Sequence, residues 1–162
     1  MTAITSVVRR YRSSDAQTTL DIFYRAIRVT ASRDYSPDQL AAWASSDIDP
    51  ADWAAGREKA ATWVAEVGGK VVGFTDIDSA GYIDMMFVDP DAGRTGVATT
   101  LLDHVREIAR SEGIGELTVN ASLTARPFFE RHGFTVVAEQ RVERRGSVLT
   151  NFRMRAPGGQ TK

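Results

Sequence analysis

The feature that most constrains this chain is an apolar run that leads into a glycine-containing turn and then into a long amphipathic helix. Residues 82–88 read YIDMMFV, and Asp89-Pro90 ends this run because proline cannot donate a hydrogen bond to a sheet. From Gly96 to Arg110 apolar residues recur every three or four positions, which is the spacing of one helix face. The sequence therefore predicts a buried strand, a turn and a helix in direct succession.

The turn, residues 93–96 with the sequence GRTG, has a chemical use. The first N–H groups of a helix have no partner inside the helix and lie at the positive end of its dipole, so anions bind there. Glycine at positions 93 and 96 lets a phosphate approach the backbone, and Arg94 adds a positive charge. The pattern favours a pyrophosphate site, and an ordinary strand-to-helix turn is the alternative reading.

Composition narrows the classes of function. The 162 residues are 43% hydrophobic, which is enough for one domain with its own core. With 20 basic and 21 acidic residues the chain has no overall field to attract nucleic acid or an anionic membrane. It has no cysteine for disulfides or thiolate catalysis, and its two histidines, His104 and His132, lie far apart in the sequence, so we expect no metal. No apolar run reaches the roughly 20 residues of a membrane span, and we expect a cytoplasmic protein.

The sequence before the apolar run predicts one strand, three helices and a hairpin. Ser14 with Gln17 reads as a capping box, and serine or aspartate followed by proline starts the next two helices. Gly68-Gly69 suits a two-residue hairpin turn. The predicted elements are a strand at 4–12, helices from Ser14 to about Ser32, from Ser36 and from Asp49, and strands at 62–67 and 71–77, which continue into the strand at Tyr82 as an antiparallel meander.

The remaining chain predicts a strand, a short helix and a final hairpin. These elements cover residues 117–121, 124–131, 134–142 and 148–154, and the tail 157–162 is expected to be disordered. The element order is that of a single mixed α+β domain, residues 1–156, and lacks the repeated βαβ units of dinucleotide-binding folds. No lysine follows Gly96, which also excludes a P-loop.

Taken together, these segments resemble the GNAT (GCN5-related) N-acetyltransferase family over nearly the whole chain. Residues 93–98, GRTGVA, resemble the family motif Gln/Arg-x-x-Gly-x-Gly/Ala after its first position. The segments FVDP before it and ATTLL after it are typical of the sequences that flank this motif in the family. The segment ARPFFERHGF at 125–134 resembles the second recurring motif. YSPDQLAAWA at 35–44 and TNFRMR at 150–155 resemble the small bacterial YafP-like branch of the family.

The resemblance implies the acyl-CoA N-acyltransferase fold, which is α+β, with a central mixed, mostly antiparallel sheet of about seven strands flanked by helices. It also implies acetyl-coenzyme A as cosubstrate. The end of the strand would pair with the pantetheine arm, the turn would hold the pyrophosphate, and Asn120 and the following helix would flank the thioester. The implied cofactor-binding residues are Met86, Phe87, Val88, Gly93, Arg94, Thr95, Gly96, Val97, Ala98, Asn120 and Phe129.

The sequence departs from the family pattern at two positions. The first motif position, usually Gln or Arg, is Gly93, so Arg94 would have to supply that phosphate contact. The tyrosine that often protonates the departing thiolate is Phe129. Water, another hydroxyl, or departure of the unprotonated thiolate would have to replace it; the hydroxyls considered are those of Tyr82, Tyr35 and Ser122.

The chemistry that follows is direct transfer, because the sequence offers neither a cysteine nor a Ser-His-Asp pattern for a covalent intermediate. An ammonium acceptor must lose a proton before it attacks, and Asp84 is the best candidate for the base. It lies on the same strand face as Tyr82 and Met86, among apolar neighbours that would raise its pKa. The alternatives are that Asp84 pairs with a core arginine or holds the substrate ammonium, and that Tyr82 acts on the base side or only packs.

The sequence thus predicts an N-acetyltransferase that acts on a primary amine of a small molecule. A non-catalytic acyl-CoA-binding or stress-response interaction protein is the alternative. Tyr35 and Trp43 come from the front helices that cover the acceptor pocket in this fold, and with Tyr82 and Asp84 they form the predicted substrate set. Homodimers are common among similar proteins, which leaves dimerisation open. Arg141, Arg144 and Arg145 are expected to form a solvated hairpin tip, with an acidic partner as the alternative.

Overall fold

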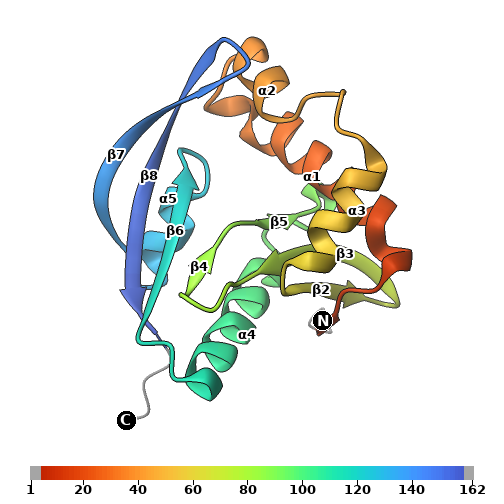
Figure 1. The fold of residues 1–162 in the computed structure, drawn as a ribbon, viewed down its shortest axis with the longest axis vertical. Coiled ribbons are helices and arrows are strands. Elements are labelled where there is room, and N and C mark those ends of the chain that lie inside the picture. Colours follow the sequence, from red (N-terminus) through yellow and green to blue (C-terminus); the bar gives the residue numbers. More distant parts are fainter. Residues whose placement is uncertain (1–4, 159–162) are drawn as a thin grey trace.

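Two four-stranded sheets lie side by side at the centre of the protein, and five α-helices pack around them (Figure 1). The computed structural model describes residues 5–158. The first sheet has the order β1-β2-β3-β5 and the second the order β4-β6-β8-β7. The strands are β1 Val7–Arg10, β2 Thr62–Val67, β3 Lys70–Asp76, β4 Tyr82–Ile83, β5 Met86–Val88, β6 Glu116–Ser122, β7 Thr135–Arg144 and β8 Ser147–Pro157.

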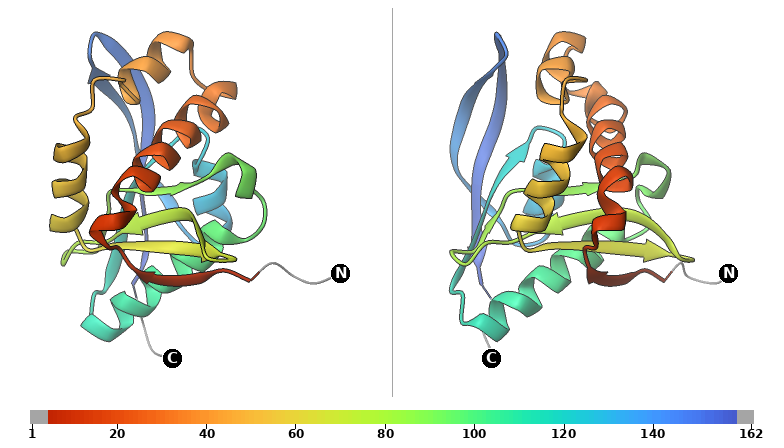
Figure 2. Two further views of the ribbon diagram at one scale, coloured as in Figure 1. Left: turned by 90° about the vertical axis from the view of Figure 1, so that its right-hand side faces the viewer. Right: turned by 45° about the vertical axis from the view of Figure 1, so that its right-hand side comes forward.

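The helices cover both faces of the first sheet (Figure 2). The N-terminal helices lie over one face, where Val64 and Phe74 join the core beneath α1, and α4 lies under the other, where Ala65 packs with Val97 and Leu101. The helices are α1 Ala16–Arg28, α2 Pro37–Trp43, α3 Pro50–Lys59, α4 Val97–Glu112 and α5 Arg126–Arg131, with short 3-10 turns at Ser13–Asp15, Thr30–Arg33 and Pro90–Ala92.

Most of the predicted elements are present. Ser36 and Gln39 form the expected capping box, and Asp49 accepts N–H groups from the first turn of α3. The hairpin turn at Gly68-Gly69 has positive φ at both residues, as expected. The cap predicted at Ser14 is wrong, because Asp15 stands at the start of α1 and its carboxylate accepts the N–H of Arg12 at 2.8 Å.

The single strand predicted over residues 82–88 is wrong, because two short strands in different sheets replace it. β5 pairs antiparallel with β3, but β4 pairs parallel with β6, so β4 does not belong to the predicted meander. The break falls at Asp84 and Met85, whose N–H groups both donate to Oδ1 of Asp76, at 2.8 and 3.1 Å. A side-chain carboxylate therefore takes the hydrogen bonds that a neighbouring strand would otherwise accept.

The α+β fold with its mixed, mostly antiparallel strand pairing is confirmed. Because the chain breaks between β4 and β5, the strands form two sheets of four instead of one central sheet. At the C-terminal end, β8 continues to Pro157, which pairs with Glu116. The disorder predicted for residue 157 is therefore wrong. Residues 159–162 of that tail, and Ile4 of the first predicted strand, lie outside the described residues.

Candidate active site

The turn between β5 and α4 presents main-chain N–H groups that no part of the protein occupies. Arg94 and Gly96 have positive φ, and Gly96, the residue before α4, has no side chain to cap the helix. The hydroxyls of Thr95 and Thr100 donate to carbonyls at Ala92 and Gly96, and neither accepts a hydrogen bond from these amides. Within residues 5–158, the N–H groups from 94 to 98 have no protein acceptor. The turn is therefore built to receive an anion.

A groove of about 900 Å³ begins at this turn and runs past β5 to α5. β5 is the last strand of its sheet, so one edge of its backbone has no strand partner. Seven of the predicted cofactor-binding residues line this groove: Met86, Phe87, Val88, Gly93, Arg94, Ala98 and Phe129. Phe129 is 3% exposed and packs edge-on against Phe134, with ring centroids 5.1 Å apart.

The other four predicted cofactor-binding residues do not line the groove. Thr95 and Gly96 belong to the turn at its end, and Val97 has its side chain in the core, so that only its main chain faces the turn. Asn120 lies elsewhere: it lines a second, smaller cavity and donates through Nδ2 to the hydroxyl of Tyr82 at 3.2 Å.

The second cavity, of about 290 Å³, brings the four predicted substrate residues together. Tyr35, Trp43, Tyr82 and Asp84 all line it, although they come from distant parts of the chain. It shares Trp43, Phe87 and Ser122 with the groove, so the two spaces meet at these side chains. A molecule in the groove and another in the small cavity would therefore both contact these shared side chains.

Asp84 and Tyr82 lie close together in the small cavity, joined by a 3.4 Å contact between the Tyr82 hydroxyl and Oδ1 of Asp84. Burial raises the pKa of Asp84, and the nearby carboxylate of Asp76 raises it further, while the Arg57 guanidinium opposes this. Burial and the charge of Asp84 raise the pKa of Tyr82. At neutral pH the phenol therefore keeps its proton, which favours Asp84 over Tyr82 as a base.

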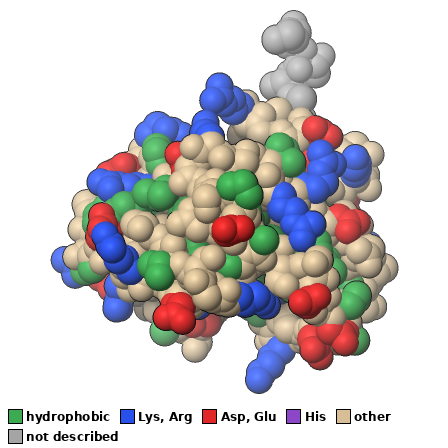
Figure 3. Space-filling view, turned by 90° about the horizontal axis from the view of Figure 1, so that it is seen from above, with side chains coloured by type: hydrophobic (Ala, Val, Ile, Leu, Met, Phe, Trp, Pro, Cys, Tyr) green, Lys and Arg blue, Asp and Glu red, His purple; other side chains and the backbone are tan. Residues whose placement is uncertain are grey.

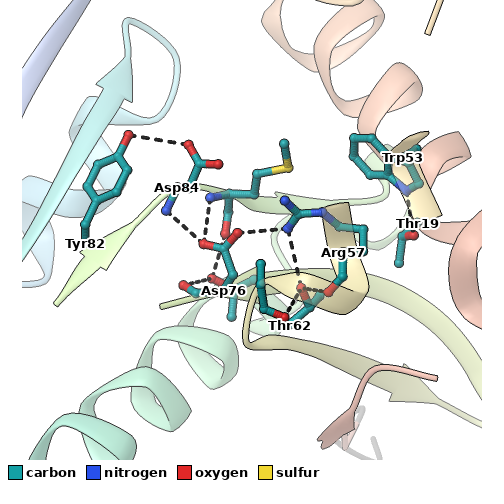
Figure 4. A network of polar contacts seen from close by, with 10 residues as sticks. Thr19, Trp53, Arg57, Thr62, Asp76, Tyr82 and Asp84 are labelled. Atoms are coloured by element: carbon teal, nitrogen blue, oxygen red, sulfur yellow. Dashed lines mark hydrogen bonds and ion pairs between the residues drawn. The ribbon is translucent and has the colours of Figure 1, made fainter. Parts of the chain in front are cut away.

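A buried ion pair supports this part of the site (Figure 4). Asp76 and Arg57 are 2.8 Å apart, with side chains only 4% and 7% exposed, and the hydroxyl of Thr62 donates to the main-chain carbonyl of Arg57 at 2.8 Å. The second carboxylate oxygen of Asp76 holds the broken strand at Asp84 and Met85. Sequence reasoning missed this pair, although an aspartate at the end of the apolar strand β3 was a signal, because a buried charge needs a partner.

The tip of the hairpin β7–β8 lies beside α2 (Figure 1), and residues of both strands line the small cavity. Tyr35 donates to the carbonyl of Thr150 at 2.6 Å, and Gln39 donates to the carbonyl of Val148 at 2.9 Å. Arg145 donates to the carbonyl of Ala42 at 2.7 Å. Arg141, Arg144 and Arg145 are all exposed, as predicted, although Arg145 contacts α2 and Arg144 also lines the small cavity. Sequence reasoning missed these three hydrogen bonds because each joins segments far apart in the chain.

The two histidines lie apart, as expected. His132 faces the carbonyl of Phe128 through Nδ1 at 2.8 Å and the hydroxyl of Thr99 through Nε2 at 3.2 Å, which ties α5 to the first turn of α4. His104 packs on the ring of Trp63 at 4.3 Å, and burial lowers its pKa. Residues 5–158 contain no group of three or more His, Asp or Glu side chains placed to hold a metal. No helix in the same range has the length and apolar character needed to cross a membrane.

Charged side chains of both signs are interspersed on the face of the molecule seen in Figure 3. This face shows no patch of one sign of the kind that polyanion binding needs. The distribution agrees with the net charge of −1. Anion binding is therefore best sought locally, at the turn before α4.

Comparison with known proteins adds to this geometry. The family model for the acetyltransferase (GNAT) domain matches residues 31–156. The uncharacterized N-acetyltransferase YafP of Escherichia coli K12 is 48% identical over 148 residues, which cover 91% of this chain and 93% of YafP. A crystal structure of a GCN5-related N-acetyltransferase from Rhodopseudomonas palustris is 35% identical, with a TM-score of 0.92 over 97% of this chain and 98% of the other.

A more distant solved structure shows the same fold. It is the PaiA N-acetyltransferase from Thermoplasma acidophilum in complex with coenzyme A, which is 16% identical, with a TM-score of 0.76 over 95% of this chain and 99% of that chain. At this identity the likeness concerns the fold alone.

Proposed function

Because this chain belongs to the GNAT family of acetyltransferases, we propose that it transfers an acetyl group from acetyl-CoA to the primary amine of a small molecule. The single observation that carries the proposal is the junction of the groove and the small cavity at Trp43, Phe87 and Ser122. A thioester and an amine would meet there beside Asp84. A cytoplasmic location and a homodimer stay predictions.

The residues of the groove fit coenzyme A. The unpaired N–H groups at 94–98 suit a pyrophosphate, and the free edge of β5 suits the amide groups of the pantetheine arm. Arg94 lines the groove beside these amides and adds positive charge. PaiA, a protein of the same fold, has been solved in complex with coenzyme A.

The closed hairpin favours a small acceptor over a protein chain. Three hydrogen bonds, from Tyr35, Gln39 and Arg145, join the front helices to the hairpin β7–β8. The small cavity of about 290 Å³ beneath them is at the lower end of the sizes that hold small molecules. A peptide segment would need this hairpin to move away.

Bound acetyl-CoA supplies the activated acetyl group, and the residues of this chain position the acceptor and move its proton. Asp84, directly or through water, takes a proton from the acceptor ammonium, so that the neutral amine can attack. Asn120 donates to Tyr82, which leaves the phenol proton free to point toward Asp84. The amine forms the new C–N bond, the C–S bond breaks, and no covalent bond to the protein is made.

A hydroxyl at the junction can replace the tyrosine that is absent at Phe129. Among the hydroxyls of Tyr35, Tyr82 and Ser122, only that of Ser122 lines both the groove and the small cavity. Its Oγ accepts the N–H of Ala125 at 3.0 Å, so its own proton is free to be donated. Ser122 or a water beside it would protonate the leaving thiolate.

An assay of free-thiol release with acetyl-CoA and a panel of small primary amines tests the proposal. We expect release that depends on the amine and an acetylated product detected by mass spectrometry. Tight binding of coenzyme A without turnover of any amine would support the alternative, a non-catalytic acyl-CoA-binding protein.

Replacing Gly96 by valine is expected to weaken coenzyme A binding by about tenfold or more. The φ of Gly96 is +86°, a region that a β-branched residue rarely adopts, so the turn must change shape and its N–H groups must move. Isothermal titration with coenzyme A measures the loss. Gly113→Val is the matched control, because Gly113 has φ +68° at the other end of the same helix and also has open space around it. Equal losses of affinity in both variants would contradict a role for the turn.

A further inference from the structure

We propose that the acceptor amine carries an anionic group, such as a carboxylate, and that Arg144 binds this group. The inference rests on the proposed function and specifies the substrate class of the same cavity. Asp84 and Arg144 are the two charged side chains that line the small cavity. A ligand with an ammonium at one end and an anion at the other would match both.

Arg144 is available for a ligand. Within the described residues it forms no ion pair, and its one hydrogen bond is a long contact of 3.4 Å from Nη1 to the carbonyl of its neighbour Glu143. The adjacent Arg145 differs, since it donates to the carbonyl of Ala42 at 2.7 Å. Of these two arginines, Arg145 fixes the hairpin, whereas Arg144 is exposed, lines the cavity and has no ion-pair partner among the described residues.

The main chain at Arg144 is held in place, which makes the cavity a site with a defined length. The neighbouring hydrogen bonds of Arg145 to Ala42 and of Gln39 to Val148 tie the turn and β8 of the hairpin to α2. The main chain at Asp84 is also held, because its N–H donates to the buried carboxylate of Asp76 at 2.8 Å. Because both main chains are held, only ligands within a limited range of lengths can reach both side chains.

One wall of the cavity is aromatic. Its aromatic wall includes Tyr35 and Trp43, which pack edge-on at 5.5 Å, and Phe87, 6.3 Å from Trp43. The hydroxyl of Tyr35 is already paired with Thr150 and Leu123. The ligand class that fits is therefore an amine joined to an oxyanion by an apolar spacer.

Two series of amines test the inference: ω-amino carboxylates with spacers of increasing length, and their carboxamides. The amine has nearly the same pKa in both members of a pair when several methylenes separate the groups, so only the anion differs. We expect kcat/KM to favour the carboxylate by about tenfold or more at one best length, as for a hydrogen bond to a charged group.

Arg144→Gln should raise KM for the carboxylates and reduce their preference over the carboxamides to about one. Arg141→Gln is the matched control, because Arg141 is exposed on the same strand and does not line the cavity; it should keep the preference. Coenzyme A affinity reports whether each variant is folded.

Three results would overturn the inference. If wild-type protein acetylates carboxamides as well as carboxylates, the proposed function stands and the inference fails. A preference that persists in Arg144→Gln places the anion at another residue and also rejects the inference. If coenzyme A binds but no member of either series is acetylated, the inference fails, and the proposed function fails with it only when the wider amine panel also shows no turnover.

Discussion

Replacing Asp84 by asparagine is expected to lower turnover by about 10²–10⁴-fold, the usual contribution of a positioned base. Asparagine keeps the shape of the side chain but cannot take a proton from an ammonium at neutral pH. Because Asp84 lines the small cavity and not the groove, coenzyme A affinity should stay nearly unchanged. Thiol release measures the first quantity and isothermal titration the second.

The pH profile separates a base from a residue that only binds the ammonium. Burial and Asp76 raise the pKa of Asp84, so protonation begins at a higher pH than for an ordinary aspartate. A protonated carboxyl cannot act as a base, so wild-type kcat at saturating amine should fall as the pH decreases through this raised pKa, whereas a residue that only binds the ammonium would raise KM and leave kcat unchanged. The residual activity of Asp84→Asn should lack this fall.

Tyr82→Phe is the companion variant, since it removes the hydroxyl beside Asp84 and leaves the ring. We expect a loss of less than about tenfold, because the variant removes one long hydrogen bond of 3.4 Å from Asp84. If Tyr82→Phe abolishes turnover while Asp84→Asn retains it, the two roles are the reverse of those proposed.

The turn and the helix after it could be predicted because their signals are local. Proline at position 90, glycine at 96 and the apolar period of α4 each act within a few residues. The arrangement of the site could not be predicted from local signals. The break between β4 and β5 depends on Asp76, which approaches Asp84 only after β3 has paired with β5. The apolar run at 82–88 alone predicts one continuous strand.

The acceptor side was predicted in part. Tyr35, Trp43, Tyr82 and Asp84 do line one cavity, as the resemblance implied. Arg144 is exposed, as predicted, but sequence alone does not show that it also lines this cavity or that the hairpin tip lies on α2. Contacts such as Arg145 to Ala42 join residues from opposite ends of the chain and carry no local pattern.

The ion pair between Arg57 and Asp76 is expected to have the largest effect on stability. Arg57→Met and Asp76→Asn each leave one buried charge without its partner, and each should lower the free energy of unfolding by about 3–5 kcal/mol. The double variant Arg57→Met/Asp76→Asn should recover part of this loss because neither charge remains. Denaturant unfolding measures all three variants.

The same two variants should shift the acid limb of the pH profile in opposite directions, which a loss of stability alone would not do. Arg57 lowers the pKa of Asp84, so Arg57→Met should move the limb to higher pH; Asp76 raises it, so Asp76→Asn should move the limb to lower pH. The profiles are measured with saturating coenzyme A at a temperature where both variants are folded. Shifts in the same direction, or no shift, would mean that the pair supports the strand break at Asp84 without adjusting the proton affinity of its carboxylate.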